Sequence, residues 1–466
     1  MDLRDIHQLR KYFGVLLCAA ILFILLTNHY YNQDQQRVQV IPNIQNSSET
    51  LQQSNSSTTI SNLKPKLKFN SLAPTFLSES LKSELDTALR KAQTTKKIIL
   101  EWYGENPKTI RLQGICGLCE ITSNKSLLND NATKAVVFNY KKIFAHTMPD
   151  RRNRRRDQFY VWQTGEAPPA LLYLHRRYFQ YEEKLGFNLT QSFRRDADIY
   201  HPYGSTYLSL WKKKKSEYQK NLNLILENKS RVAVAVISNC HTMPGANVRL
   251  QFVRDIKSEG MNLHTLGGCF KFPTFPKLEK KKFADLLKTY KFYFAFENSY
   301  HCRDYITEKF FVNGLDASAI PIVWGATKQD YDAIAPPGSY IYADDFSTVK
   351  ELINYINYLD KNDTAYLEYF KWYQMPLEKL TEYGRQIRYC QLCRILHGIN
   401  VDDMFNPNYN ESTYERPLIS DKIYPRSVKS LYNWYYKTEY KDCLKSPSRF
   451  YRDNVSLAAK TLAKRT

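Results

Sequence analysis

The chain has 466 residues, and at roughly 100 to 200 residues per domain this length predicts two or three domains with a sizeable core. A peptide-sized or disulfide-only scaffold is excluded. The net charge of +21 (67 Lys and Arg against 46 Asp and Glu) indicates an anionic partner or substrate. Aromatic residues make up 14 %, which argues against a disordered chain, and no glycine-rich phosphate loop of the G-x-x-x-x-G-K-[ST] or G-x-G-x-x-G form occurs.

The first element in chain order is an uncharged apolar run at residues 12–26, YFGVLLCAAILFILL. Arg4, Arg10 and Lys11 precede it, so the positive-inside rule keeps residues 1–11 in the cytosol as a short tail. A cleaved signal peptide is the alternative interpretation. Because no small-residue cleavage site follows, we favour a transmembrane signal anchor at residues 12–31, which makes the chain a single-pass type II membrane protein.

The cysteines agree with a luminal position. Apart from Cys18 in the apolar run there are eight, an even number that favours disulfides and leaves their pairing open: Cys116, Cys119, Cys240, Cys269, Cys302, Cys390, Cys393 and Cys443. Two C-x-x-C pairs offer the alternative of a four-thiolate zinc site. Their wide separation along the chain is unlike zinc-ribbon spacing, so bridges are favoured.

Residues 32–95 are rich in polar side chains and read as a luminal stem, with one helix-like stretch, SLKSELDTALRKA, near its end. Apolar runs typical of buried strands follow, in two groups. The first group is KIILEWYG (97–104), KAVVFNY (134–140) and QFYVWQTGE (158–166). The second is RVAVAVIS (231–238), NLHTLGG (262–268), FYFAFEN (292–298), IPIVWG (320–325) and YIYADDF (340–346).

Helix-like segments separate these strands, among them NVRLQFVRDIKSEG and a helix that we expect Ser347 to cap, STVKELINYINYL. Such alternation predicts parallel, doubly wound sheets. We therefore predict an α/β fold with two Rossmann-like lobes that meet near residue 225, at residues 96–225 and 226–400. A C-terminal extension at 401–466 matches no pattern.

The densest chemical signal is FYFAFENSYHCRDYITEKFFVNGLDASAIPIVWGA, from Phe292 to Ala326. A buried strand would deliver Glu297 and Asn298 to its carboxyl edge, where open α/β sheets bind ligands. We expect a helix to begin at about Tyr305, with a first turn that holds Tyr305, Thr307, Glu308 and Lys309. Helix amides and a lysine attract phosphates, and a carboxylate can bind a ribose diol, so the pattern predicts a nucleoside-diphosphate site. The alternative is core packing beside a solvated helix start.

This stretch resembles the signature of the α1,3-fucosyltransferase family, Golgi enzymes that use GDP-fucose. The resemblance extends to TSNKSLLNDNATKAVVFNY, VWQTGEAP, SFRRDADIYHPYG, the segment 239–249, YIYADDF and the C-x-x-C at Cys390, and so covers roughly residues 100 to 400. It implies the two-lobed GT-B arrangement, with the acceptor-binding lobe at 96–225 and the GDP-fucose-binding lobe at 226–400.

The resemblance also implies site residues. Those matching Arg249 and Lys309 neutralise the diphosphate, and those matching Asn298, Tyr305 and Glu308 contact GDP-fucose.

The glutamate of TGEAP, Glu166, matches the family's candidate general base, which an inverting transfer needs to deprotonate the acceptor hydroxyl. Relatives usually have F-E-S-P here, so Thr164 and Gly165 leave the setting of the carboxylate open. Lys141 stands where some relatives carry an acceptor-selecting residue, and its basic side chain favours a 1,3 over a 1,4 linkage.

Asp196 and Asp198 have the D-x-D form of a manganese site in another glycosyltransferase fold. We expect no obligatory metal, because Lys and Arg can stabilise the leaving group, and a divalent cation would at most stimulate. The basic runs at 151–156, 212–215 and 277–282 are expected to be solvated or to attract a nucleotide sugar, rather than to bind nucleic acid.

These observations predict a Golgi membrane enzyme that transfers L-fucose from GDP-β-L-fucose to O3 of N-acetylglucosamine in a glycoprotein or oligosaccharide acceptor, with inversion. A GT-B transferase with another nucleotide sugar and a catalytically silent glycan-binding relative are the alternatives. The choice between N-glycan core and outer antenna stays open, as does the oligomeric state.

Overall fold

A computed structural model describes residues 78–104, 109–143, 145–175, 186–204, 207–241, 243–270, 280–299, 302–375, 388–405, 409–410, 412, 417–420, 422–423, 430–437 and 443. All of them belong to one compact unit. The predicted anchor at 12–31 and most of the predicted stem lie outside these residues. Within the described ranges, no helix has the length and apolar character that a membrane span requires.

The first of two sheets has seven strands in the order β2-β3-β1-β4-β5-β6-β7. Its strands are β1 (Lys97–Glu101), β2 (Ile110–Leu112), β3 (Cys119–Thr122), β4 (Thr133–Asn139), β5 (Phe159–Thr164), β6 (Leu189–Ser192) and β7 (Ile199–Tyr200). Neighbours run parallel except β2, which is antiparallel to β3. The central strands contain continuous buried apolar runs, at 98–100, 135–138 and 159–162, as expected for a parallel sheet that is covered on both faces.

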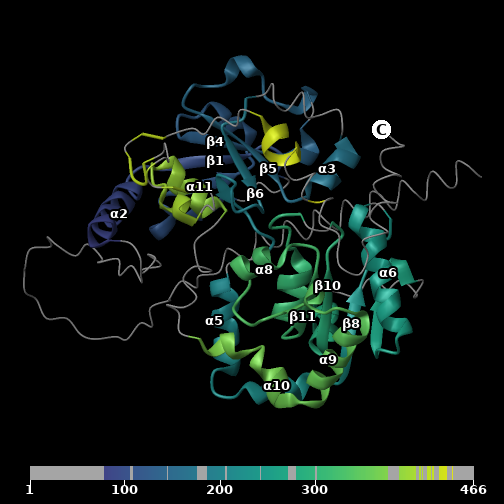
Figure 1. The fold of residues 1–466 in the computed structure, drawn as a ribbon. Helices are drawn as coiled ribbons and strands as arrows, with labels where there is room; N and C mark the ends of the chain where they lie inside the picture. Colours follow the sequence, from purple (N-terminus) through teal and green to yellow (C-terminus); the bar gives the residue numbers. More distant parts are fainter. Residues whose placement is uncertain are drawn as a thin grey trace, which may run out of the picture. The chain divides into compact units, whose positions relative to one another are not determined.

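The second sheet has five parallel strands in the order β12-β11-β10-β8-β9 (Figure 1). Its strands are β8 (Arg231–Val236), β9 (Leu263–Leu266), β10 (Tyr290–Phe296), β11 (Ile320–Trp324) and β12 (Ile341–Tyr342). β10 lies at the centre, with β11 on one side and β8 on the other. Its carboxyl end therefore lies at the middle of one sheet edge, where a doubly wound sheet places its ligand.

Helices connect the strands of both sheets. The α-helices are α2 (Glu79–Ala92), α3 (Pro168–His175), α5 (Tyr207–Tyr218), α6 (Pro244–Ser258), α7 (Lys280–Lys288), α8 (Lys328–Ile334), α9 (Val349–Lys361), α10 (Asp363–Glu368) and α11 (Tyr389–Leu396). Two π-helices are η8 (Lys309–Asp316) and η14 (Tyr432–Lys437). The structure confirms the predicted α9 but corrects its cap: Thr348, not Ser347, accepts the hydrogen bond from the Glu351 amide at 3.1 Å.

All eight predicted strands are confirmed, but β2, β3, β6 and β7 were not expected. β6 shows the reason, because its sequence LTQS places Thr190, Gln191 and Ser192 in the interior, where each is at most 2 % exposed. β6 lacks the apolar run from which the eight strands were predicted, because these residues are polar. They are tolerated here because Thr190 donates to Asp198 from both its amide and its hydroxyl, at 2.8 Å each.

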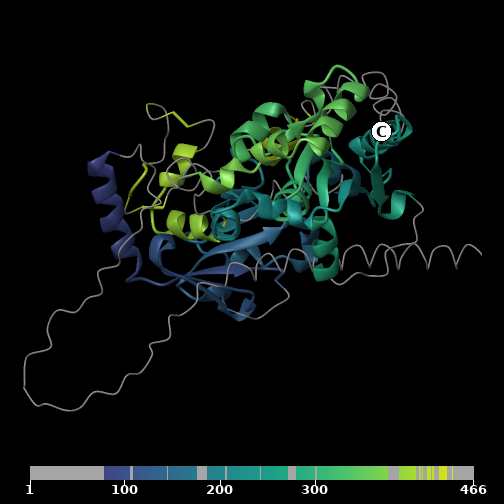
Figure 2. The same cartoon turned by 90° about the horizontal axis from the view of Figure 1, so that it is seen from below.

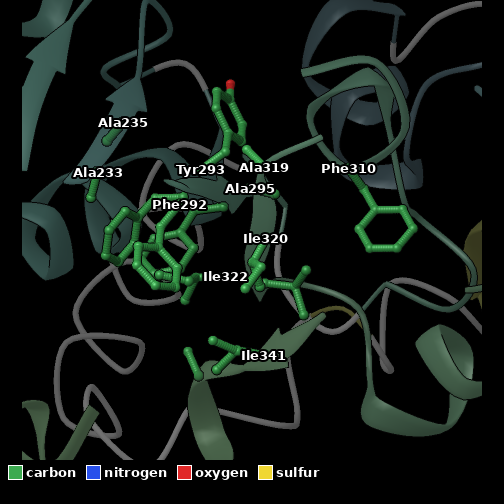
Figure 3. Packing of buried hydrophobic residues seen from close by; sticks show 14 of the residues in the cluster. Ala233, Ala235, Phe292, Tyr293, Ala295, Phe310, Ala319, Ile320, Ile322 and Ile341 are labelled. Carbon is green, nitrogen blue, oxygen red and sulfur yellow. The ribbon is translucent and has the colours of Figure 1, made fainter. Parts of the chain in front are cut away.

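The core of the second sheet shows the alternation of a pleated strand. Phe292 pairs in register with Ile320, and in Figure 3 both lie with Ile322 and Ile341 while Tyr293 points the other way. Side chains from α6, η8 and α9 complete this apolar cluster. This packing fixes β10 up to its last residue, Phe296, which directly precedes Glu297.

Four disulfides join the eight cysteines: Cys116–Cys390, Cys119–Cys393, Cys240–Cys269 and Cys302–Cys443. The two C-x-x-C motifs are therefore cross-linked to each other and do not form the alternative four-thiolate zinc site. Both bridges attach α11 to the first sheet, where Leu392 and Ile395 join its core. α11 thus packs against the first sheet although it falls within the predicted 226–400 lobe.

Helix α2 lies near the segment that follows α11, and Figure 2 shows the purple helix beside the yellow-green one. Leu89 and Ala92 pack against Ile399, and the Gln93 side chain donates to the Gly114 carbonyl at 2.7 Å. Ser78 caps the helix by accepting from the Leu81 amide at 3.2 Å. The helix-like end of the predicted stem therefore contacts the folded unit.

Candidate functional site

The second sheet delivers a buried carboxylate to the end of its central strand. β10 ends at Phe296, and the next residue, Glu297, is completely buried. One of its oxygens, Oε1, accepts hydrogen bonds from the Thr307 amide at 2.9 Å and from the Thr307 hydroxyl at 2.8 Å. Glu297 thus ties the strand end to the loop that carries the other predicted donor residues.

Lys309 lies at the centre of a charged cluster. Its Nζ is 3.0 Å from Glu297 Oε2 and 3.0 Å from Glu308 Oε1, and it donates to the Thr307 hydroxyl at 2.7 Å. Burial acts against the positive charge, but the two carboxylates outweigh it and raise the pKa of Lys309 above its ordinary range. Burial raises the pKa of Glu297. The lysine is therefore a fixed positive charge at the sheet edge.

Arg249 reaches the same edge from α6. It is 2 % exposed, and its guanidinium donates from Nη1 to the Phe296 carbonyl at 2.9 Å and from Nη2 to the Asn239 carbonyl at 3.0 Å. Among the described residues its Nε has no hydrogen-bond partner and its charge has no ion pair. Burial lowers the pKa of Arg249, and Glu297 acts in the opposite direction. A buried cation without an anion bonded to it suits a phosphate ligand.

Asn298 lies against the first turn of α6. A Cβ added to Gly245 would come within 2.7 Å of the Asn298 carbonyl oxygen, so only glycine permits this approach. The Asn298 side chain accepts a hydrogen bond from the Ser299 hydroxyl at 3.4 Å. The close packing sets the strand end beside the start of the helix that carries Arg249.

The helix after this loop begins later than the sequence predicts. η8 starts at Lys309 with Glu308 as its N-cap, so Tyr305 and Thr307 lie in the loop and not in a first helical turn. Asp304 has a φ of 61°, a left-handed conformation, and the Thr307 amide is already bound by Glu297. Because both features belong to an irregular loop, the helix cannot extend back to Tyr305.

Tyr305 lies where a loop of the second sheet contacts loops of the first sheet. Its ring centroid is 5.1 Å from that of Phe193 and 6.1 Å from that of Tyr203, which follow β6 and β7 of the first sheet. Burial raises the pKa of Tyr305 well above its ordinary value, and Glu166 reinforces this together with Glu297 and Glu308. The tyrosine therefore lies within electrostatic reach of carboxylates from both sheets.

Glu166 follows β5 on a loop that hydrogen bonds hold in place. Its amide donates to the Thr164 hydroxyl at 3.1 Å, the Tyr203 hydroxyl donates to the Gly165 carbonyl, and the Tyr435 hydroxyl donates to the Glu166 carbonyl at 2.5 Å. The TGE sequence that departs from the family pattern thus has a well-defined local structure. The Glu166 side chain is 25 % exposed, so its carboxylate remains accessible to a substrate.

Lys141 forms an ion pair with Glu166. Its Nζ is 2.8 Å from Glu166 Oε1, and the lysine side chain is 37 % exposed. Lys141 follows β4, the neighbour of β5 in the sheet, which explains why residues 25 positions apart meet. The sequence suggested an acceptor-selecting role for Lys141 but did not indicate this contact.

The structure gathers the predicted residues at the carboxyl edges of the two sheets, with Tyr305 between the two groups. Sequence reasoning missed Tyr203 and Tyr435 altogether, named Thr307 only as a residue of the expected first helical turn, and named Glu297 only as a residue at a strand end. The position of Glu297 directly after an apolar strand was the available signal. The roles of the other three are recognised only through hydrogen bonds that their neighbours in sequence do not reveal.

The D-x-D aspartates are engaged with protein groups. Asp196 accepts from Arg194 Nε at 2.8 Å and from Arg303 Nη2 at 2.9 Å, and Asp198 accepts from Thr190. In the described ranges, the group with metal-ligand spacing is Cys119, Cys393 and His397, and its two cysteines are joined as a disulfide.

Two family models match the chain. The model described as "Fucosyltransferase, N-terminal" matches residues 94–204, and "Glycosyltransferase family 10 (fucosyltransferase) C-term" matches residues 226–410. The two matches coincide with the two sheets and end before η14 and Cys443.

Curated relatives give the same picture. The chain is 33 % identical over 312 residues to glycoprotein 3-alpha-L-fucosyltransferase A of Drosophila melanogaster, a match that spans 66 % of this chain but only 56 % of the relative. It is 34 % identical to a bovine 3-galactosyl-N-acetylglucosaminide 4-alpha-L-fucosyltransferase, over 59 % of this chain and 69 % of the relative. A crystal structure of an alpha1,3-fucosyltransferase with GDP-fucose aligns with a TM-score of 0.40 at 18 % identity, over 68 % of this chain and 91 % of that one.

Proposed function

The chain belongs to glycosyltransferase family 10 and is an α-1,3/4-fucosyltransferase. From this premise we propose that it transfers L-fucose from GDP-β-L-fucose to O3 of N-acetylglucosamine in protein-linked glycans, with inversion at the anomeric carbon. The observation that carries the proposal is the pairing of a sheet edge that presents the buried Arg249 and the largely buried Lys309 with a partly exposed carboxylate, Glu166, on a loop of the first sheet. The sheet edge binds a diphosphate, and the carboxylate accepts the proton of a sugar hydroxyl.

Arg249 and Lys309 hold the diphosphate of the donor in this proposal. Both side chains stay charged as the reaction proceeds, because an arginine guanidinium keeps its proton in proteins and two carboxylates raise the pKa of Lys309. When the bond between the fucose C1 and the phosphate oxygen breaks, their charges stabilise GDP as the leaving group. Asn298, Tyr305 and Glu308 complete the donor contacts, with Glu308 placed to accept from a sugar hydroxyl.

Glu166 is the general base. Its carboxylate takes the proton from O3 of the acceptor as that oxygen attacks C1 of fucose on the face opposite GDP. The proton ends on Glu166, the new bond joins O3 to C1, and the electron pair of the broken bond leaves with GDP. One carboxylate suffices for this single displacement, which inverts the anomeric centre.

The acceptor assignment rests on the relatives and on Lys141. The Drosophila relative is named for a glycoprotein acceptor and a 3-alpha linkage, whereas the bovine one is named for a 4-alpha linkage. Lys141 beside Glu166 supports the 1,3 linkage, because it stands at the residue expected to select the acceptor and touches the proposed base.

We place the enzyme in the Golgi membrane as a single-pass type II protein, with its anchor at residues 12–31 and a stem to residue 95. Four disulfides support a luminal catalytic part, since such bridges persist in oxidising compartments. The two parallel sheets support a GT-B arrangement, with the acceptor lobe at 96–225, the donor lobe at 226–400 and an extension at 401–466.

The test of the function is fucose transfer by the purified luminal fragment, residues 60–466. The fragment is given GDP-fucose with a panel of N-glycan core and lactosamine acceptors, with and without EDTA, and the product linkage is determined. We expect an α1,3 product that survives EDTA. Transfer only to O4, or loss of transfer with EDTA, would contradict the proposed linkage or the absence of an obligatory metal.

The role of Glu166 has its own prediction. Glu166→Gln keeps the shape and hydrogen-bonding capacity of the side chain but cannot accept the proton, so we expect turnover to fall by about 10² to 10⁴-fold. The thermal shift that GDP produces should remain, because the donor contacts are untouched. Near-normal turnover of this variant would remove Glu166 as the base.

A further inference from the structure

A segment beyond the family match packs beside the predicted base. We call residues 430–437 together with Cys443 the C-terminal segment; it contains η14, the yellow π-helix of Figure 1. Leu431, Tyr435 and Cys443 belong to the same buried cluster as Trp162 of β5. The rings of Trp162 and Tyr435 lie 5.3 Å apart at a steep angle. The segment is thus part of the core under the strand that ends in the TGE loop.

Tyr435 connects this segment to Glu166. Its side chain is completely buried, and its hydroxyl donates to the Glu166 carbonyl at 2.5 Å. The hydrogen bond constrains the peptide group of the very residue whose side chain must meet the acceptor. Because the hydrogen bond is partly buried and its donor is fully buried, breaking it costs more than breaking an exposed hydrogen bond would.

The C-terminal segment is also linked to one loop of each sheet. Cys443 forms a disulfide with Cys302, and the Cys302 carbonyl accepts from the Tyr305 amide at 3.1 Å. The Trp434 carbonyl accepts from Arg194 Nη1 at 2.8 Å, and the Arg194 guanidinium lies 4.9 Å from the Trp434 ring centroid. Contacts on both sides therefore fix Tyr435 relative to the loop that carries Tyr305.

We infer that the C-terminal segment is a positioning element of the transfer reaction, in which Tyr435 holds the backbone of Glu166 at the distance from the donor loop that proton abstraction requires. The inference rests on the proposed function, because it acts through Glu166 as the base. Tyr435 is a positioning residue and makes no contact with substrate in this scheme. A displacement of the base by about 1 Å lowers turnover by about 10²-fold, so a single hydrogen bond can matter for rate.

The test is Tyr435→Phe, which keeps the ring in the core and removes only the hydroxyl. We expect kcat to fall at least about ten-fold. KM for GDP-fucose and the thermal shift with GDP should stay within about two-fold of the native values, because Arg249 and Lys309 are unchanged. A purely structural role would lower Tm without this separation of kcat from KM.

Tyr366→Phe provides a matched control. Tyr366 is also completely buried, and its hydroxyl donates to the Lys291 carbonyl at 3.0 Å, near the amino end of β10 and so at the opposite end of the strand from Glu297. Both variants lose one partly buried hydrogen bond from a buried tyrosine to a carbonyl, so their Tm values should fall alike. The control should keep the native kcat.

The outcomes separate the inference from the proposed function when Glu166→Gln is measured in parallel. An inactive Glu166→Gln with a Tyr435→Phe that retains native kcat overturns the positioning inference alone. An equal fall in kcat for Tyr366→Phe and Tyr435→Phe also overturns it, because the effect would then follow stability. A fully active Glu166→Gln overturns the base, and with it any action of Tyr435 through that base.

Discussion

The side chains at this site are held in place largely by hydrogen bonds and ion pairs with residues that are distant in sequence. Glu166 is held by Thr164, Tyr203 and Tyr435, and its carboxylate is paired with Lys141. The resemblance to the fucosyltransferase family identified the glutamate, because Glu166 in TGEAP matches the family's candidate general base. It could not identify the partners, since hydrogen bonds depend on where the chain returns and not on local pattern.

Lys141 gives a prediction at this scale. Lys141→Met removes the charge that fixes Glu166 Oε1, and because the pair is partly exposed we expect only about a ten-fold loss in kcat/KM. Lys141→Arg should retain most of the activity, since it can restore the ion pair. Steady-state kinetics on the preferred acceptor measures both.

Lys96→Met is the control for Lys141. Lys96 pairs with Glu120 at 3.0 Å with similar exposure, at the opposite end of the first sheet's strands from the site. Its removal should leave kinetics unchanged. If Lys141→Met instead alters the ranking of acceptors at constant kcat, Lys141 selects the acceptor and does not position the base.

Helices and strands were predicted correctly where their sequence patterns were strong. Apolar runs predicted eight strands, and periodicity predicted α6 and α9, because burial on one stripe or on both faces leaves a regular mark on the sequence. The loop before η8 departed from its pattern. Asp304 in a left-handed conformation and a Thr307 amide bound to Glu297 displace the helix start to Lys309.

α5 carries a prediction about pH. Lys214 is 2 % exposed and donates to the Asp316 carbonyl and to the Ser318 hydroxyl, each at 2.8 Å, and burial lowers its pKa to about 8. The unfolded chain binds this proton more tightly, with a pKa of 10.5, so the free energy of unfolding rises as the pH increases from 8 to 10.5. Below pH 8 the buried charge costs about 3 kcal/mol.

Lys214→Met removes this titration. Between pH 7 and pH 10.5 the unfolding free energy of the native protein should therefore rise by about 3 kcal/mol relative to that of the variant. Denaturant unfolding at the two pH values measures it. Lys213→Met, a half-exposed lysine on the same helix, is the control, and an equal shift in both variants would contradict the assignment to Lys214.

At the scale of the molecule, two loops bind the sheets to each other by reciprocal ion pairs. Arg195 of the first sheet donates to Asp304 from its amide at 2.9 Å and from Nε at 2.7 Å, while Arg303 donates to Asp196 at 2.9 Å. Nearby, a Cβ on Gly204 would come within 2.5 Å of the Phe311 ring, so the two parts are in close contact. This interface fixes the Tyr305 loop, which we propose binds the donor, relative to the loops of the first sheet.

Asp304→Asn tests the interface. Asn tolerates the left-handed conformation of this residue but removes the nearer carboxylate of Arg195, which keeps only its 3.5 Å contact with Asp330. We therefore expect a loss of about 1.5 to 3 kcal/mol in stability and a higher KM for GDP-fucose. The double variant Asp304→Asn, Arg195→Met should lose less stability than the sum of the two single variants, because either substitution alone already breaks the Arg195–Asp304 pair. Thermal unfolding of the native protein, both single variants and the double variant measures the coupling, and strictly additive effects would contradict it.

From its amino-acid sequence alone the chain is predicted to have two groups of parallel strands, an even set of bridging cysteines and a nucleoside-diphosphate site at a strand end. These predictions follow from local composition and from the periods of strand and helix, which a short window contains. The candidate base comes from the resemblance to the fucosyltransferase family. The folded structure is needed to show which of roughly 100 cysteine pairings occurs, that Lys141 pairs with Glu166, and that Tyr435 lies beside the site. Each of these contacts joins residues 25 to 274 positions apart, so the path of the whole chain, and no local preference, creates them.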